Sequence, residues 1–360
     1  MKALVLSGGG AHGAYEAGVA HALMQRESFD FICGVSIGAI NAALLSTGED
    51  GAIEHFWHHA MPESAPRLFP HIPRLRQTIE QIVSIGSGNA LQDAMRIARA
   101  ATLFPFIRNL GRIHHETLAL IAAELGKMLD FSRRRHALLV GATNITRGSS
   151  AVFQADGVSH RIPDHRAERV RLTEYHEMDA QNFVMLLLAS SAMPGLFSPI
   201  ELTFGEERAL YADGCIIHNS PLALAIDHGA TEITVVLVDP EPTDGVGVKT
   251  PDLAQMAHNI ATLWQQRMLD YELRLAYAHN EILRLGGDTE KRPISIRHVR
   301  PKAELEIDML AFDDAPGLSR LFDLGMRDGA LSPLPSIPEL PPRASADRRN
   351  WLRRLWQRSA

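Results

Sequence analysis

The sequence contains very little cysteine and no long apolar segment. Two cysteines, Cys33 and Cys215, occur among 360 residues, too few for a disulfide framework or a zinc site built from cysteine alone. A membrane-spanning helix needs about 18 consecutive apolar residues. The nearest approach, residues 31–45, is interrupted by two glycines and two polar residues. The first residues also lack the pattern of a signal peptide, so we expect a cytoplasmic protein.

An excess of positive charge is missing as well. Lysine and arginine number 36 against 42 aspartates and glutamates, a net charge of −6. Proteins that bind nucleic acid usually have the opposite imbalance, so we expect no nucleic-acid partner. With 46% hydrophobic and 22% charged residues, the composition is globular, and the length suits one large α/β domain or two smaller ones.

Two strand–turn–helix units begin the chain. Residues 3–6 form a short apolar run that ends in glycines and precedes a helical pattern over 14–25. Residues 29–35 repeat this order before a helix over 39–45. Two such units predict an α/β fold with three layers, α/β/α, around a mainly parallel sheet. Further strands are expected at 136–142, 151–154, 209–212, 232–238 and 294–299, and further helices at 75–83, 117–129, 179–191 and 253–285.

Two regions depart from this regular pattern. Residues from about 51 to 130 alternate helical stretches with proline and glycine breaks, and we interpret them as a helical cap inserted into a domain of residues 1–330. Residues 331–360 contain a proline-rich linker and a basic amphipathic tail, 343–360, with tryptophan and leucine on one helical face. Such a tail fits transient contact with a membrane surface, which would make the protein peripheral there, or docking on a protein.

The turn after the second strand has the pattern Gly34-x-Ser36-x-Gly38. A serine on a sharp strand-to-helix turn presents its hydroxyl above the sheet, and only small neighbours allow that turn. The helix that starts at Ile37 directs its positive dipole end and its free N–H groups at the same point. Ser36 is therefore a candidate nucleophile, although the five-residue pattern alone also fits a serine that caps the helix.

A second glycine turn, Gly8-Gly9-Gly10-Ala11-His12-Gly13, follows the first strand. It matches the G-x-G-x-x-G pattern of dinucleotide sites, which need an acidic residue near the end of the second strand. This chain has the Ser36 turn there, and Asp30 lies at the start of that strand. Glycine turns also expose backbone N–H groups that can bind a developing negative oxygen. An oxyanion hole beside a serine nucleophile explains both turns, whereas dinucleotide binding explains one.

A serine hydroxyl needs a base, and the sequence offers several. Asp213 and Asp239 each follow a predicted strand. A histidine would complete a triad if the fold brought it to the serine; the candidates are His160, His176, His218 and His298. The remaining histidine clusters lack the spacing and the neighbouring cysteines of zinc sites, and we interpret them as helix surface: His55-x-x-His58-His59 and His114-His115.

Four segments, taken in order, resemble the patatin-like phospholipases: Gly8–Gly13, Gly34–Gly38, the Ser-Ser-Ala-Met-Pro-Gly stretch of residues 190–195, and Asp213-Gly214. Through these motifs the resemblance covers about residues 3–230. It departs from the family pattern at Cys215, where a glycine or alanine is usual, and at His12, where a basic residue is common.

The resemblance implies a Ser–Asp dyad in place of a triad, and it implies no cofactor or metal. The implied roles are Ser36 as nucleophile, Asp213 as proton acceptor, and an oxyanion hole formed by Gly8, Gly9 and Gly10 together with Ile37. The glycines that shape the turns are Gly13, Gly34, Gly38 and Gly214.

A dyad without histidine requires an unusual environment. An aspartate with a pKa of about 3.9 is a weak base in water, so the carboxylate must be desolvated to act on a serine. We therefore expect a covered apolar pocket, suited to a lipid acyl chain, with residues 51–130 as its lid. The expected activity is hydrolysis of carboxylic esters of phospholipids or other lipids. The alternatives are acyl transfer by the same dyad, an oxidoreductase that binds a dinucleotide through Gly8–Gly13, and an inactive lipid-binding protein.

Overall fold

The computed structural model describes residues 1–70, 119–155, 173–194, 197–241, 253–285 and 292–333. Several predicted features lie outside these residues: most of the cap including the helix at 75–83, the His114-His115 pair, His160, and the basic tail 343–360.

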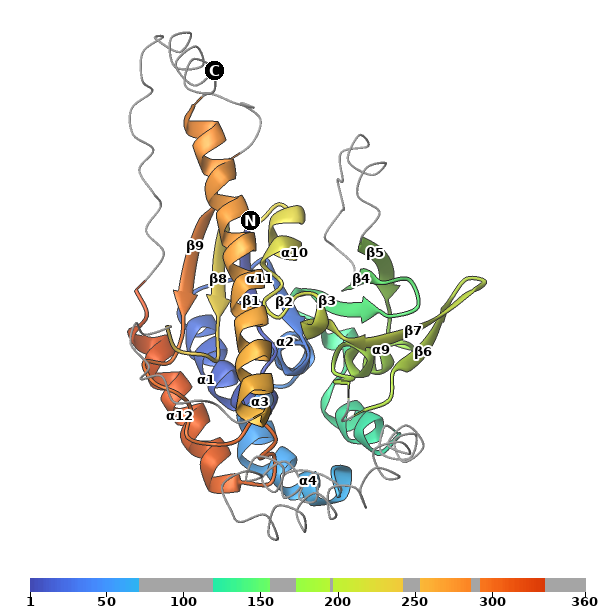
Figure 1. The fold of residues 1–360 in the computed structure, drawn as a ribbon. Helices are drawn as coiled ribbons and strands as arrows, with labels where there is room; N and C mark the ends of the chain where they lie inside the picture. Colours follow the sequence, from blue (N-terminus) through green and yellow to red (C-terminus); the bar gives the residue numbers. More distant parts are fainter. Residues whose placement is uncertain (71–118, 156–172, 195–196, 242–252, 286–291, 334–360) are drawn as a thin grey trace.

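A nine-stranded sheet forms the centre of the described residues (Figure 1). Its main path runs β5-β4-β3-β2-β1-β8-β9. Neighbours from β3 to β9 along this path pair in parallel, whereas β4 is antiparallel to β3 and the β6–β7 hairpin joins the end of β3. The mainly parallel sheet is therefore confirmed. The strands are β1 Lys2–Leu6, β2 Phe31–Val35, β3 Ala137–Asn144, β4 Ser149–Ala155, β5 Thr173–Met178, β6 Ile200–Phe204, β7 Glu207–Asp213, β8 Glu232–Val236 and β9 Ser295–Val299.

Helices cover both faces of the sheet and complete the three layers (Figure 1). One face buries the larger apolar core beneath α1, α2, α9 and α12, and the other buries a smaller core beneath α10 and α11. In the described ranges, no helix combines the length and the apolarity needed to cross a membrane. The helices are α1 Gly13–Met24, α2 Ile37–Thr47, α3 Ala52–His55, α4 Met61–Leu68, α9 Phe183–Ser190, α10 Leu222–Asp227, α11 Leu253–Arg284 and α12 Ala315–Leu331, and residues 119–128 are also helical.

The C-terminal helix α12 packs tightly along α1. A Cβ on Gly18 of α1 or on Gly325 of α12 would overlap backbone atoms of the other helix, so glycine at both positions allows the two backbones to touch. The Tyr15 hydroxyl donates to Asp328 at 2.9 Å. The Arg26 guanidinium donates to three carbonyl oxygens at the end of α12. These contacts hold α12 against the helix that follows the first glycine turn.

Candidate active site

Ser36 lies on the turn between β2 and α2, and its backbone is strained. Its φ of 55° and ψ of −128° fall outside the usual regions for a residue with a side chain, and it is the one non-glycine residue with positive φ in the described part of the chain. A Cβ on Gly34 would overlap the Gly38 carbonyl, and one on Gly38 would lie 2.6 Å from the Ser7 carbonyl oxygen. The two glycines therefore allow the sharp turn that presents the serine hydroxyl.

The strand β3 brings Ser36 and Asp213 together. β2 pairs with β3 up to Val35, which lies opposite Gly141. β7 pairs with the next part of β3 along the same edge, and Asp213 lies opposite Ala142. The end of β2 and the end of β7 are therefore neighbours, although they are far apart in sequence. The Ser36 hydroxyl donates a hydrogen bond to Asp213 Oδ2 at 2.6 Å, and both residues are buried.

Burial raises the pKa of the Asp213 carboxyl to about 6, because a charged carboxylate loses its hydration there. Hydrogen bonds from the Ser36 hydroxyl and the Cys215 backbone N–H act in the opposite direction and favour the carboxylate. The turn Gly214–Ile216 forms with Cys215 in it, and the cysteine N–H lies 2.9 Å from Asp213 Oδ1. An aspartate with this pKa is ionised at neutral pH and is a stronger base than an aspartate in water.

Two serines at the end of α9 hold the backbone of the candidate nucleophile. Ser190 Oγ accepts the Ser36 N–H at 3.0 Å and donates to the Gly141 carbonyl at 2.7 Å. Ser191 Oγ donates to the Ser36 carbonyl at 3.0 Å. Ser190 and Ser191, which the sequence indicated only as part of a family motif, therefore position the strained turn directly.

The first glycine loop lies beside Ser36, but one of its predicted oxyanion donors is already used. The Gly8 N–H donates to the Asn219 carbonyl at 3.0 Å. Within the described residues, the N–H groups of Gly9, Gly10 and Ile37 have no acceptor. The candidate oxyanion hole therefore narrows from four residues to these three.

A buried polar network fixes the start of this loop. The Ser7 N–H donates to the fully buried Glu16 carboxyl group. The Asn41 amide donates to Glu16 Oε2 and to the Gly13 carbonyl, both at 2.9 Å, and its Oδ1 accepts the Trp57 indole N–H. Burial raises the pKa of Glu16 well above its usual value, although both hydrogen bonds to its carboxyl group lower it. The network joins β1, α1 and α2 directly beneath the two glycine turns.

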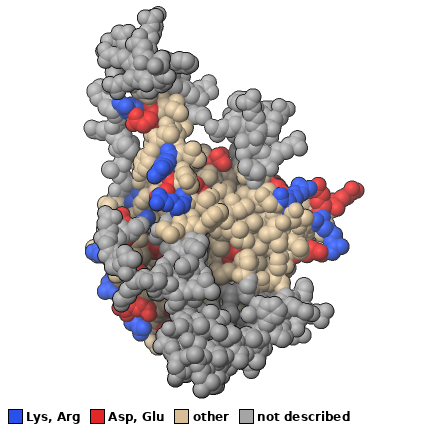
Figure 2. Space-filling model, in the orientation of Figure 1, with Lys and Arg blue, Asp and Glu red and all other residues tan. Residues whose placement is uncertain are grey.

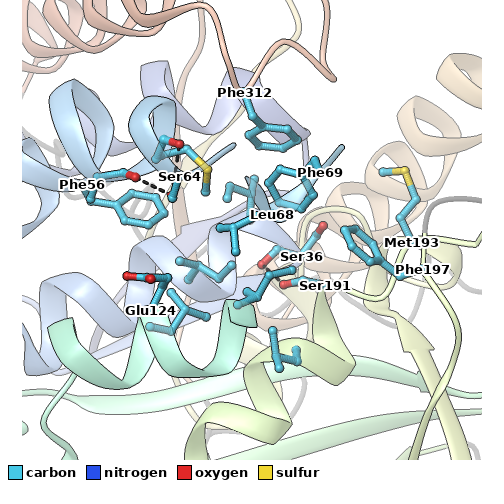
Figure 3. Close-up of a pocket in the computed structure, with 18 of the residues that line it drawn as sticks. Ser36, Phe56, Ser64, Leu68, Phe69, Glu124, Ser191, Met193, Phe197 and Phe312 are labelled. Carbon is cyan, nitrogen blue, oxygen red and sulfur yellow. Dashed lines mark hydrogen bonds between the residues drawn. The ribbon is translucent and has the colours of Figure 1, made fainter. Parts of the chain in front are cut away.

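An apolar pocket opens at Ser36 (Figure 3). Its empty volume is about 940 Å³, including the part that is open to solvent. Three aromatic rings lie close together around it, with the Phe69 ring centroid 5.8 Å from that of Phe197 and 5.2 Å from that of Phe312. Ser64, Glu124 and Ser191 are polar exceptions. The apolar lining residues are Ile37, Ile40, Phe56, Ala60, Met61, Leu68, Phe69, Ile121, Leu125, Met128, Leu188, Met193, Phe197, Leu310 and Phe312.

The alternative bases lie elsewhere. His218 Nδ1 is 2.7 Å from Glu272 Oε1, and the His176 ring stacks on Phe204 with centroids 3.7 Å apart. His298 belongs to β9, and Asp239 follows β8. Among the described side chains, no three His, Cys, Asp or Glu residues meet in a way that could hold a metal ion.

Asn219 and the segment 309–312 also contact the glycine loop, although neither was predicted to do so. Besides accepting the Gly8 N–H, Asn219 places its Oδ1 2.8 Å from the point where a Gly8 Cβ would lie. The Met309 carbonyl accepts the Ala11 N–H at 2.8 Å, so this segment packs on the glycine loop. A pattern such as Asn-Ser-Pro indicates a turn, but neither segment has a sequence signal that connects it with a serine many residues earlier.

Comparisons with known proteins identify a family. The model of the patatin-like phospholipase family matches residues 4–226. No curated protein matches the chain.

Two solved structures are similar to this chain over much of its length. VipD from Legionella pneumophila shares 14% identity with a TM-score of 0.35, over 91% of this chain and 66% of that one. The complex of SpcU with ExoU from Pseudomonas aeruginosa contains a second similar chain, with 18% identity and a TM-score of 0.26, over 76% of this chain and 53% of that one. The present chain therefore spans just under two thirds of the first and about half of the second.

Proposed function

The chain belongs to the patatin-like phospholipase family, and on that premise we propose that it is a lipid acyl hydrolase with a Ser36–Asp213 dyad. The observation that supports this most directly is the 2.6 Å hydrogen bond between the Ser36 hydroxyl and a fully buried aspartate, at the mouth of an apolar pocket. The range that the family model matches, residues 4–226, includes both residues.

The proposed reaction starts with proton transfer. Asp213 accepts the Ser36 proton while Oγ attacks the carbonyl carbon of an ester, and the carbonyl π electrons move to oxygen. The N–H groups of Gly9, Gly10 and Ile37 stabilise the negative oxygen of the tetrahedral intermediate. Its collapse breaks the ester C–O bond, and Asp213 returns the proton to the leaving alcohol. Water then attacks the acyl-enzyme with Asp213 again as base, which releases the fatty acid and restores the serine.

The environment of Asp213 supports a base that works without histidine. Because burial raises its pKa to about 6, proton transfer from a serine hydroxyl is about 3 kcal/mol less unfavourable than to an aspartate with an ordinary pKa. The rest of the barrier reduction has to come from the oxyanion donors, each of which typically contributes about 10²–10³ in rate.

The pocket supports an acyl chain as the part of the substrate that is bound. Its walls are aliphatic and aromatic apart from four polar side chains, one of which is Ser36. A hydrocarbon chain therefore gains by leaving water, whereas a charged headgroup does not. We therefore place the acyl chain in the pocket and the alcohol portion of the ester toward solvent.

The test compares hydrolysis of a p-nitrophenyl ester and of a phospholipid by the wild type, Ser36→Ala and Asp213→Asn. We expect both variants to lose at least about 10³-fold in kcat/KM. Asp239→Asn is the matched control and should retain activity, since Asp239 follows β8 and the Ser36 hydroxyl donates to Asp213. Equal turnover by the wild type and the two dyad variants would refute the proposal.

A second experiment separates a live nucleophile from an inactive lipid-binding protein. A fluorophosphonate probe should label wild-type Ser36 covalently, with the modified peptide identified by mass spectrometry, and should not label Asp213→Asn at a comparable rate. Product analysis in the presence of an alcohol acceptor distinguishes hydrolysis from acyl transfer, because both pass through the same acyl-enzyme. Absence of labelling in the wild type would favour the inactive lipid-binding protein.

A further inference from the structure

The solvent-facing side of α11 is apolar, which is the reverse of what a helix on the surface of a domain needs. Six of its large apolar side chains are strongly exposed, as is Leu285 directly after its last residue, with exposed fractions from 44% to 70%. The six are Leu263, Trp264, Tyr271, Leu275, Tyr277 and Ile282. In Figure 2, uncharged and charged side chains both lie on the part of this face that is not drawn in grey.

Most of the exposed apolar residues follow a seven-residue repeat, from which Leu263 and Tyr277 depart. Steps of four and three alternate through seven positions, which form a seam along one side of the helix: Trp264, Met268, Tyr271, Leu275, Ala278, Ile282 and Leu285. This is the spacing of a coiled-coil seam, sustained here over three repeats. An amphipathic helix that only packs on its own domain turns its apolar side inward and needs no such repeat outside.

The opposite side of α11 is already fixed to the domain. Leu269 and Leu273 pack on the smaller core. The buried Glu272 bonds His218 and the Ala223 N–H, and Asn280 exchanges two hydrogen bonds with the backbone of Ile294. The helix therefore cannot rotate to bury the seam without breaking these contacts.

The length and direction of α11 also separate the seam from the candidate active site. A helix of 32 residues extends about 48 Å, far more than a five-residue strand such as β8. Figure 1 shows α11 rising from the level of α3 to beyond the starts of β8 and β9, away from α4, which lines the pocket. A lipid surface that delivers substrate to the pocket would meet the other end of the molecule.

We infer that the seam binds the same seam of a second copy of this chain, in an antiparallel pair of α11 helices. Charge complementarity supports this arrangement. Arg274 and Glu281 occupy equivalent flanking positions of consecutive repeats. Glu281 pairs with Arg284 of its own helix at 2.8 Å, but its side chain remains 59% exposed, so a second arginine can also reach it. In an antiparallel pair such positions face one another, so Arg274 of each copy meets Glu281 of the other. The same register sets Tyr271 against Ile282 and Leu275 against the small Ala278, and the twofold axis repeats every contact.

The first test is the mass of the full chain in solution, measured by sedimentation velocity or by light scattering after size exclusion. We expect twice the chain mass of 39.6 kDa for the wild type, and the mass of one chain for Leu275→Glu, because a charge at the centre of the seam opposes burial. Leu331→Glu is the matched control, since Leu331 is equally apolar, is 80% exposed and lies at the end of α12; it should remain a dimer. The far-UV circular dichroism spectrum should be the same in all three, which shows that the variants fold.

The second test reverses the charges. Arg274→Glu and Glu281→Arg should each weaken the dimer about tenfold, because each turns two attractions into repulsions, and the double reversal should restore it. Failure of the double variant to recover would contradict the antiparallel register.

Three results would overturn the inference. One is a wild type that stays monomeric up to about 100 µM. Another is a monomer whose binding to anionic vesicles is lost in Leu275→Glu, since the seam would then contact lipid. The last is a chain that dimerises only after deletion of residues 343–360, since the tail would then cover the seam. None of these outcomes depends on whether Ser36 is catalytic.

Discussion

The protonation of Asp213 should control activity between pH 5 and pH 7. The base must be ionised to accept the serine proton, and burial raises its pKa to about 6. About half of the molecules are then competent at pH 6 and about a tenth at pH 5, so kcat/KM should fall about tenfold for each unit below 6 and reach a plateau above 7. An aspartate in water would instead keep full activity down to about pH 5.

The assay is the initial rate with a short p-nitrophenyl ester from pH 4.5 to pH 9, followed at the isosbestic wavelength of p-nitrophenol. His218→Ala serves as the control, because His218 is paired with Glu272 and not with the serine. It should leave the inflection near pH 6 in place. A profile that is flat from pH 5 to pH 8, or an inflection that disappears in the histidine variant, would refute this account of the base.

The same titration should appear in the stability of the fold. The folded-state pKa of Asp213 lies above the unfolded value, so the folded state retains a proton that the unfolded state has lost between about pH 4 and pH 6. Stability therefore falls as the pH rises through this window, by at most about 3 kcal/mol for a difference of about two pKa units. Asp213→Asn avoids this cost. In urea denaturation, the free energy of unfolding of Asp213→Asn relative to that of the wild type should be larger at pH 8 than at pH 4. If the difference between the two proteins is the same at both pH values, the carboxylate is not desolvated.

Three substitutions test other parts of the site and fold. Gly8→Ala places a Cβ 2.8 Å from Asn219 Oδ1 and 3.2 Å from the Ser36 Cβ. It should lower kcat about 10²-fold, because both neighbours must shift; unaltered kcat would contradict the tight packing of the two turns. Ser190→Ala removes a hydrogen bond to the Ser36 N–H and one to a buried carbonyl, and should cost about 1–3 kcal/mol in denaturant unfolding and slow fluorophosphonate labelling; Ser132→Ala, on an exposed turn, should do neither. Gly325→Leu would force the α1 and α12 backbones apart and should cost about 3 kcal/mol or more, read from thermal unfolding; a stable variant would show that α12 is not held as described.

The strands and turns near the N-terminus could be predicted because their signals are local. β1 and β2 are buried along almost their whole length, so they form continuous apolar runs, and small residues follow each at once. The Ser36 turn has the same property, since Gly34 and Gly38 are required by contacts within the turn and with β1. The pairing with Asp213 was indicated by family resemblance, because no local pattern connects residues that only β3 brings together.

Other elements were missed because their sequences mix opposing signals. β5 is at the edge of the sheet and is mostly half-buried and polar, so it lacks an apolar run. β6 alternates buried and exposed positions over five residues, too few for a reliable period. α12 contains one proline and three glycines, which usually indicate turns; here the proline lies in the first turn, and Gly325 allows contact with α1.

The prediction that Gly8 is an oxyanion donor illustrates a different limit of sequence analysis. A glycine run shows that N–H groups can be exposed, but it does not show which of them the rest of the chain will occupy. Asn219 decides this for Gly8, and it does so from a loop more than 200 residues away in sequence. The choice among donors therefore depends on tertiary contacts.

The segment recognised as a family member is smaller than the unit that folds. A protein shortened to end at residue 226 would lack β8 and β9. The strand β1, which is an inner strand in the full sheet, would then become an unpaired edge strand. It would also lose the Met309 carbonyl that holds the glycine loop and the two pocket side chains Leu310 and Phe312. Recombinant fragments designed from the family boundary alone should therefore aggregate, and expression should extend at least through residue 333.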